Sequence, residues 1–280
     1  MKIFVVGLGL IGGSMALELK QKMHAVVYGV DSDPDHIEKA FELGIIDKKG
    51  SLDQVGIADI VILAVPVDAL KYILPEILDH ISNDALVLDV GSTKLGIAKV
   101  VENHPKRGNF VAAHPIAGTE FSGPTAAHVG LFNEKVNIIC DKDLSSDGSL
   151  TKAMNVFGYL GMRNIFMNSK DHDKHIAYVS HISHISSFML GKTVLEIEQN
   201  EKNIFDMAGS GFESTVRLAK SSPEMWSPIF LQNKENVLPA LNEYIKNLQE
   251  FKALIEENDR EGLRNSMEET NHIKTILKNL

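Results

Sequence analysis

The sequence predicts an α/β protein in which an N-terminal, doubly wound Rossmann-type domain is followed by an all-helical C-terminal domain. Short runs rich in Val and Ile alternate with helix-like segments as far as about residue 168, and strand-like runs stop after it. Several of these runs are apolar on both faces, as parallel strands covered by helices on each side should be. We therefore expect two domains, at residues 1–168 and 169–280.

Seven strands are expected in the first domain. They cover residues 2–6, 25–30, 59–65, 85–90, 109–113, 136–140 and 163–167. Helices are expected over residues 11–21, 35–43 and 149–159. This alternation of strand and helix is typical of a parallel sheet with helical crossovers.

The second domain carries the spacing of an amphipathic helix. In residues 234–257, apolar side chains recur every three or four positions, at Leu238, Leu241, Ile245, Leu248, Phe251 and Ile255. Such a stripe near the end of a small domain needs an apolar partner. We expect a homodimer formed through the helical domain, and the alternative is burial of the stripe within one chain.

Composition excludes several classes of function. The chain has 280 residues, 44% of them hydrophobic, and a net charge of −9, which argues against a nucleic-acid partner. Its one cysteine, Cys140, cannot form an intrachain disulfide, and no apolar stretch approaches the roughly twenty residues that span a bilayer. The N-terminus runs into an apolar strand without a basic leader. We expect a cytoplasmic protein with no membrane partner.

A glycine-rich loop joins the first strand to the first helix. It consists of Gly7, Leu8, Gly9, Leu10, Ile11 and Gly12. In this context Gly7 allows the tight turn, Gly9 lets the backbone approach a pyrophosphate, and Gly12 lets helix and strand pack closely. The loop predicts dinucleotide binding with the phosphates at the helix N-terminus, and a purely structural turn is the alternative.

An acidic residue and a proline turn complete the expected cofactor site. Asp31, about twenty residues beyond the loop, ends the second strand where a carboxylate would bind the adenosine ribose. No Arg or Lys stands beside it to hold a ribose phosphate, so NAD is expected rather than NADP. Asp31 is alternatively a helix N-cap, a role that Ser32 or Asp33 fills better. Val65 and Pro66 are expected to pack beside the cofactor in a structural role.

Two polar side chains follow successive strands at the edge where ligands of such sheets bind. Ser92 lies in the run from Asp89 to Lys94, and His114 opens the run that ends at Glu120. A neutral imidazole there can accept a proton from a substrate hydroxyl as hydride leaves the same carbon. Ser92 can bridge that hydroxyl and the ring. We expect His114 and Ser92 to be catalytic, and a structural histidine is the alternative.

These motifs resemble the prephenate dehydrogenase family over nearly the whole chain. The resemblance rests on the glycine loop, the two runs that contain Ser92 and His114, the Ser180 to His184 segment, and residues 211–226. It implies NAD(P)-dependent oxidative decarboxylation of prephenate to 4-hydroxyphenylpyruvate in tyrosine biosynthesis, with hydride passing from substrate C4 to the nicotinamide. It also implies that His114 hydrogen-bonds the C4 hydroxyl and that Ser92, beside the cofactor, supports it.

The resemblance further implies a set of substrate-binding residues. Arg217 matches an arginine that holds a substrate carboxylate, a task that suits its planar fork. His184 matches a second active-site histidine. Glu120 matches an acidic residue that gates entry through a changing ion pair, while a plain turn or helix-cap role stays equally open. Gly118 and Thr119 belong to the same substrate-contacting run.

Four histidines close in sequence raise the question of a metal. They are His172, His175, His181 and His184. We expect no metal, because only Asp171 and Asp173 offer further ligands and hydride transfer to NAD needs none. His172 and His175 are expected at a helix surface or a domain interface. Trp226 is expected to anchor the core or the dimer interface.

Some alternatives stay open. No single residue separates prephenate from arogenate as the substrate, so an arogenate dehydrogenase is one alternative. A β-hydroxyacid dehydrogenase or imine reductase, which would use a lysine such as Lys220, is another, and an NAD-sensing protein without catalysis is a third. The segment from Ser180 to His184 also departs from the family pattern at Ile182 and Ser183, where a proline of that pattern is missing. This departure puts the start of a helix there in doubt.

Overall fold

A single sheet forms the body of the N-terminal half in the computed structural model, which describes residues 1–198 and 204–277. Its strands are β1 (Lys2–Val6), β2 (Val26–Val30), β3 (Lys48–Lys49), β4 (Ile60–Leu63), β5 (Leu86–Asp89), β6 (Phe110–Pro115), β7 (Val136–Cys140) and β8 (Arg163–Met167). They are ordered β3-β2-β1-β4-β5-β6-β7-β8. All neighbours are parallel except β6 and β7. The first six strands follow the doubly wound order, as expected.

All seven predicted strands are present, and one further strand was not predicted. The short β3 pairs with β2 at the edge of the sheet, with Lys48 opposite Tyr28. Because two consecutive lysines carry no apolar pattern, nothing in the sequence marks this strand.

Helices cover both faces of the sheet, and alternate strand residues point to each. The helices of this half are α1 (Leu10–Lys22), α2 (Pro34–Glu42), α3 (Val67–His80), α4 (Leu95–Val100) and α5 (Asp147–Tyr159), with short turns η1 (Leu52–Ile57), η2 (Arg107–Asn109), η3 (Pro124–Ala126) and η4 (Lys142–Leu144). In β1, Ile3 and Val5 pack with α1 and α5, whereas Phe4 and Val6 pack with α3 and α4. This two-sided burial explains why the strands are apolar on both faces.

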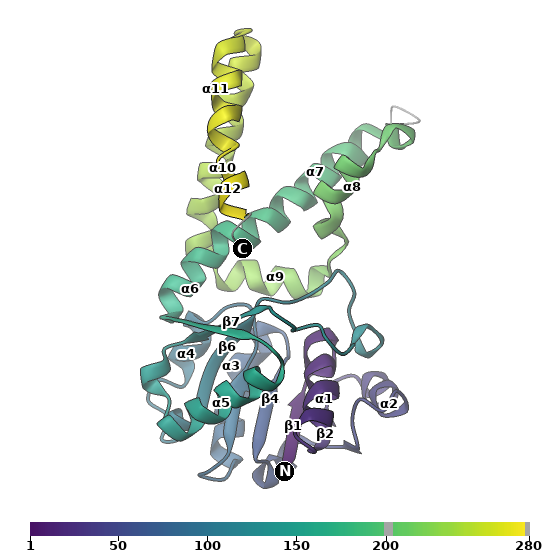
Figure 1. Ribbon diagram of the computed structural model, residues 1–280, viewed down its shortest axis with the longest axis vertical. Coiled ribbons are helices and arrows are strands. Elements are labelled where there is room, and N and C mark those ends of the chain that lie inside the picture. Colours follow the sequence, from purple (N-terminus) through teal and green to yellow (C-terminus); the bar gives the residue numbers. More distant parts are fainter. Residues whose placement is uncertain (199–203, 278–280) are drawn as a thin grey trace.

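The second half is helical, as predicted. Its elements are α6 (Ser169–Ile176), the π-helical turn η5 (Ala177–His181), α7 (Ile182–Glu198), η6 (Ile204–Met207), α8 (Ser210–Val216), η7 (Arg217–Lys220), α9 (Pro223–Gln232), α10 (Lys234–Glu256), α11 (Arg260–Thr270) and α12 (Ile273–Leu277). Figure 1 shows α9 lying across the end of the sheet domain, while α7 with α8 and α10 with α11 project away as two arms. Trp226 and Ile229 of α9 join the core on the α3 face.

The doubtful helix start near Ile182 is resolved by a π turn. The chain passes without a break from α6 through η5 into α7, so no new helix starts at Ile182. A π turn adds a residue to the helical repeat and changes the direction of the side chains beyond it. His181 ends this turn and is buried, while His184 follows one turn later and is half-buried.

The apolar stripe of α10 is not buried within one chain. Five of its members keep between 37% and 56% of their surface exposed, namely Leu238, Ile245, Leu248, Phe251 and Ile255. The alternative that one chain buries the stripe by itself is therefore wrong. Separately, none of the helices described is long and apolar enough to cross a membrane.

Candidate active site

The glycine loop has the geometry of a phosphate cradle. Gly7 has a φ of 94°, and a Cβ there would collide with the backbone oxygen of Ala64. A Cβ at Gly12 would collide with the backbone oxygen of Gly7, so both glycines are required by packing. By contrast, a Cβ at Gly9 would meet nothing within 4 Å among the described residues beyond its own neighbours in the chain. The open space in front of Gly9, which caps α1, fits the close approach of a ligand phosphate.

Asp31 is held in place at the end of β2. Its carboxylate oxygens accept hydrogen bonds from the backbone N–H of Leu8 (2.7 Å) and of Asp33 (3.0 Å). Asp33, as expected, caps α2, because its side chain accepts from the N–H of Asp35. His36 was not predicted to belong to this site, yet its ring nitrogens lie 3.7 Å from a carboxylate oxygen of Asp31 and 3.8 Å from one of Asp33. The ribose end of the expected cofactor site is therefore lined by two carboxylates and an imidazole.

The turns after β4 and β5 reach the same edge of the sheet. Pro66 caps α3 with a φ of −51° and is exposed, and Val65 before it is half-buried. Ser92 is half-buried three residues beyond the end of β5. Residues beyond the carboxyl ends of parallel strands lie together at one edge, so these turns and the glycine loop face one region.

His114 lies within β6 rather than after it, which corrects the expectation that its ring emerges from a turn. The strand continues through Pro115, and His114 pairs with Ile138 of the antiparallel β7. The cause is this pairing, because β7 supplies partners for residues that an isolated parallel strand would leave free. His114 still lies at the carboxyl end of β6 and is half-buried.

His114 is not alone: a buried histidine and a carboxylate stand behind it. Its Nδ1 lies 2.8 Å from Nε2 of His172, and Nδ1 of His172 lies 2.8 Å from Oδ1 of Asp173. His172 is only 1% exposed, so of the two positions expected for it the domain interface is confirmed and the helix surface is wrong, while His175 is exposed. The contact joins the two halves of the chain, and no spacing pattern could link residues 58 positions apart.

A buried ion pair supports the ends of β5 and β6. The ammonium of Lys94 contacts the carboxylate of Asp89, and both side chains are fully buried. The same ammonium donates to the backbone oxygen of Ala113 (2.7 Å), next to His114. Asp89 also accepts from the N–H of Gly91 (2.7 Å). The pair therefore connects the Ser92 turn to the strand that carries the histidine.

The surroundings of His114 favour the neutral form of its ring. Desolvation is the main cause that holds the pKa of its imidazole well below the ordinary value of 6.5. Nearby His172, Lys94 and His181 lower the pKa further. A neutral imidazole retains a lone pair that can accept a proton.

The second group of aromatic and histidine side chains comes from the helical half. His184 stacks on Trp226, with ring centroids 3.5 Å apart, and its Nδ1 lies 3.0 Å from the backbone oxygen of Ser180. Burial lowers the pKa of His184, and the charge of Arg217 acts in the same direction. Trp226 is 7% exposed and lies in the apolar core, as expected of an anchor residue.

Arg217 and Glu120 come together from opposite halves of the chain. A guanidinium nitrogen of Arg217 lies 3.8 Å from a carboxylate oxygen of Glu120. Arg217 has 53% of its side chain exposed and Glu120 has 24%, so the pair borders solvent. Gly118 and Thr119 are exposed in the same loop, where Thr119 Oγ1 accepts from the N–H of Phe121 (3.2 Å).

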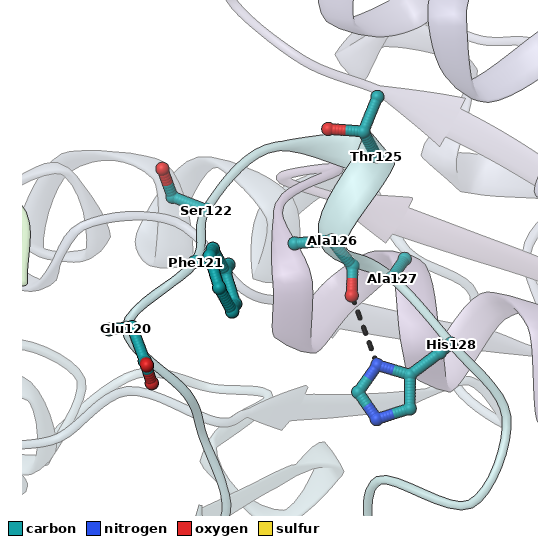
Figure 2. A pocket seen from close by; sticks show the side chains of 7 residues that line it. All are labelled: Glu120, Phe121, Ser122, Thr125, Ala126, Ala127 and His128. Carbon is teal, nitrogen blue, oxygen red and sulfur yellow. Dashed lines mark hydrogen bonds between the residues drawn. The ribbon is translucent and has the colours of Figure 1, made fainter.

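The loop that follows β6 also lines an open pocket of its own. Figure 2 shows this pocket of about 630 Å³, with Glu120 at one end and His128 at the other, where the His128 ring bonds to the backbone oxygen of Ala126 (3.0 Å). Its lining is confined to residues 120–128 and does not include His114. This pocket therefore does not contain the candidate catalytic histidine, although Glu120 lines it.

Across residues 1–198 and 204–277, no group of three or more His, Cys, Asp or Glu side chains is arranged to hold a metal ion. The fold and the site instead combine a glycine cradle, a carboxylate at the end of β2 and a neutral histidine at the carboxyl edge of the sheet. Together they define an oxidoreductase with a nucleotide-binding domain.

Comparison with known proteins identifies the family. Residues 15–166 match "Prephenate dehydrogenase, nucleotide-binding domain", and residues 168–269 match "Prephenate dehydrogenase, dimerization domain". The chain belongs to the prephenate dehydrogenase family. Because the chain belongs to this family, the alternatives of a β-hydroxyacid dehydrogenase and an imine reductase are wrong.

Relatives within the family cover almost the entire chain. The chain is 31% identical to the prephenate dehydrogenase of Bacillus subtilis (strain 168), over 93% of this chain and 72% of that protein. It is also similar to a crystal structure of prephenate dehydrogenase from A. aeolicus in complex with hydroxyphenyl propionate and NAD+, with a TM-score of 0.90, 33% identity, and coverage of 99% and 98% of the two chains. The Synechocystis arogenate dehydrogenase is 28% identical with a TM-score of 0.78, covering 99% of this chain and all of that one (100%).

Proposed function

We propose that this enzyme oxidises and decarboxylates prephenate to 4-hydroxyphenylpyruvate with NAD, in tyrosine biosynthesis. The observation that carries the proposal is the neutral His114 at the carboxyl end of β6, the edge of the sheet at which the glycine loop and Ser92 also lie. The similar A. aeolicus enzyme, whose structure holds NAD+ and hydroxyphenyl propionate, supports both the cofactor and the substrate class.

The residues present fit a dinucleotide. The pyrophosphate would lie over Gly9 at the N-terminus of α1, and Asp31 would accept hydrogen bonds from the adenosine ribose. Val65, Pro66 and Ser92 would border the nicotinamide end. Bound NAD would supply the hydride acceptor. Asp33 beside Asp31 places a second negative charge where a ribose phosphate would lie, which favours NAD over NADP.

In the proposed reaction, His114 acts as the base. Its neutral ring accepts the proton of the C4 hydroxyl while C4 releases its hydrogen with both bonding electrons. The electron pair of the bond between C1 and its carboxylate then moves through the ring onto the C4 oxygen, which takes the proton back, so CO2 leaves and the ring becomes aromatic. Ser92, on the neighbouring strand end, supports the hydroxyl. The chain needs only to orient the substrate and to hold one proton.

The substrate is proposed to lie between the two halves of the chain. Arg217 would grip a carboxylate through its two parallel N–H groups once its ion pair with Glu120 opens. His184, held flat against Trp226, would contact the substrate from the helical side. Gly118 and Thr119 would contact it from the loop after β6. This placement makes the Glu120 pair a gate rather than a helix cap.

Two further parts of the proposal concern organisation. A homodimer is supported by the match to the family's dimerization domain and by the exposed apolar stripe of α10. A Leu248→Glu substitution should convert dimers to monomers in analytical ultracentrifugation, and an unchanged sedimentation profile would argue against this interface.

We also propose that the two domains meet between residues 168 and 169, which is supported by the start of α6 at Ser169, and that the enzyme is cytoplasmic.

The test is direct. Purified enzyme is mixed with prephenate or arogenate and with NAD or NADP, and reduced cofactor and the aromatic product are measured. We expect turnover of prephenate with NAD, and its loss on His114→Asn but not on substitution of the exposed His175 by Gln. Preference for arogenate would transfer the assignment to the other known substrate of the family. Binding of NAD without turnover of either acid would overturn the proposal.

A further inference from the structure

The chain of contacts behind His114 runs from one imidazole to another and ends on a carboxylate. His114 Nδ1 faces His172 Nε2 at 2.8 Å, and His172 Nδ1 faces Asp173 Oδ1 at 2.8 Å. His172 is 1% exposed and Asp173 is 3% exposed. Asp173 is itself anchored, because its two oxygens accept from the backbone N–H of Lys94 (2.8 Å) and of Leu95 (3.0 Å).

Hydrogen-bond chemistry determines which group donates at each step from His114 through His172 to Asp173. A carboxylate only accepts, so the proton between His172 and Asp173 belongs to Nδ1 of His172. A neutral His172 then has an unprotonated Nε2, which can only accept from His114. The proton of the neutral His114 ring is therefore on Nδ1, and its Nε2 carries the free lone pair.

We propose that His172 and Asp173 are positioning residues that hold His114 in its Nδ1–H tautomer and so present Nε2 to the substrate hydroxyl. The role in catalysis rests on the proposed function, whereas the tautomer does not. When Nε2 accepts the hydroxyl proton, the ring becomes an imidazolium that keeps its Nδ1–H bond to His172. The negative charge of Asp173, one ring further away, stabilises that cation.

The surroundings of the pair support this assignment. The charged or titratable groups around it are Lys94 at the start of α4, whose carboxylate partner Asp89 ends β5, His181 from η5, and Asp173 itself. Lys94 is already satisfied by Asp89 and by the backbone oxygen of Ala113, so it is not needed by His172. The amide of Asn233 donates to the backbone oxygen of Asp173 (2.7 Å), which fixes this residue from the far side. Asp173 is thus held by elements of both halves of the chain.

Two substitutions of His172 distinguish a role in holding the His114 ring proton from a role in packing alone. His172→Phe keeps a ring of similar size but offers no acceptor to His114. His172→Gln places a carbonyl oxygen where Nε2 stood, so it can still accept from Nδ1–H. Both variants remove the bond to Asp173 and leave its two backbone donors in place. His175→Gln, on the exposed side of the same helix, is the matched control.

Steady-state kinetics gives the first readout. We expect His172→Phe to lower kcat by about 10²-fold or more, because a misplaced ring proton removes the base. The KM for the substrate and the affinity for NAD should stay near those of the parent enzyme. His172→Gln should recover most of the lost kcat, and His175→Gln should match the parent. Equal losses in the Phe and Gln variants, or no loss in the Phe variant, would overturn the proposal.

The second readout does not depend on turnover. In ¹⁵N NMR spectra of the histidine-labelled enzyme without ligands, His114 should show a protonated Nδ1 and an unprotonated Nε2. This pattern should persist in His172→Gln and give way to a mixture of tautomers in His172→Phe. A protonated Nε2 on His114 in the parent enzyme would refute the inference even if prephenate is turned over. The expected spectra without prephenate turnover would leave the tautomer assignment intact and defeat the proposed function instead.

Discussion

The buried pair of Lys94 and Asp89 allows a sharp test of how the active-site edge is held. Replacement of Lys94 by Met keeps the length of the side chain and removes its charge. Asp89 then keeps its hydrogen bond from Gly91 but loses its cation, at a place where both side chains are fully buried. The backbone oxygen of Ala113 also loses its donor.

The expected size of the effect follows from burial. Breaking a buried ion pair by removal of one partner costs about 3–5 kcal/mol, because the other charge stays desolvated. This cost is a large fraction of the roughly 5–15 kcal/mol that stabilises a native domain. In the double variant Lys94→Met/Asp89→Asn neither member of the pair carries a charge, and the amide oxygen still accepts from Gly91. The double variant should therefore be more stable than Lys94→Met alone.

Urea unfolding followed by circular dichroism measures these differences. A matched control is Lys142→Met, because the pair of Lys142 and Asp143 has the same chemistry but side chains that are 47% and 88% exposed. The control should change the free energy of unfolding little, since solvent screens exposed pairs. A Lys94→Met variant as stable as the control would refute the reasoning. So would a double variant less stable than Lys94→Met.

Four further outcomes are expected. Gly9→Ala should fold normally, because its Cβ enters open space, but should weaken NAD binding in calorimetry, whereas Gly12→Ala should lower the unfolding midpoint itself. Arg217→Ala should raise the substrate KM strongly with NAD affinity unchanged; equal weakening of both would indicate structural damage. Since the pKa of His114 lies well below 6.5, kcat should stay level from neutral to alkaline pH and fall only in acid; a midpoint near 7 would contradict this. Burial lowers the pKa of His181 to about 4 in the folded protein, whereas in the unfolded chain this ring binds a proton below about pH 6.5. Stability should thus fall from pH 6.5 towards 4, by about 2 kcal/mol at pH 5, and His181→Gln should reduce that slope in acid titrations of unfolding.

Much of the fold and part of the site were predictable because they depend on local pattern. Strands such as β1 and β4 are buried on both faces and therefore apolar, which made them predictable. The partly exposed β8 shows only a short apolar run, and the two lysines of β3 carry no apolar signal. The glycine loop was predictable because only glycine tolerates the positive φ of Gly7 and the close packing of Gly12.

The sequence by itself determined seven of the eight strands, the helices α1, α2 and α5 of the first half, the glycine cradle, and the placement of Ser92 and His114 near the carboxyl ends of neighbouring strands. Only the tertiary structure decided that His172 and Asp173 stand behind His114, that Lys94 and Asp89 form a buried pair beneath it, and that Arg217 meets Glu120. The reason is physical. Periodicity records which side of an element is buried, but a contact between distant residues depends on how two elements pack, and no local pattern encodes that geometry.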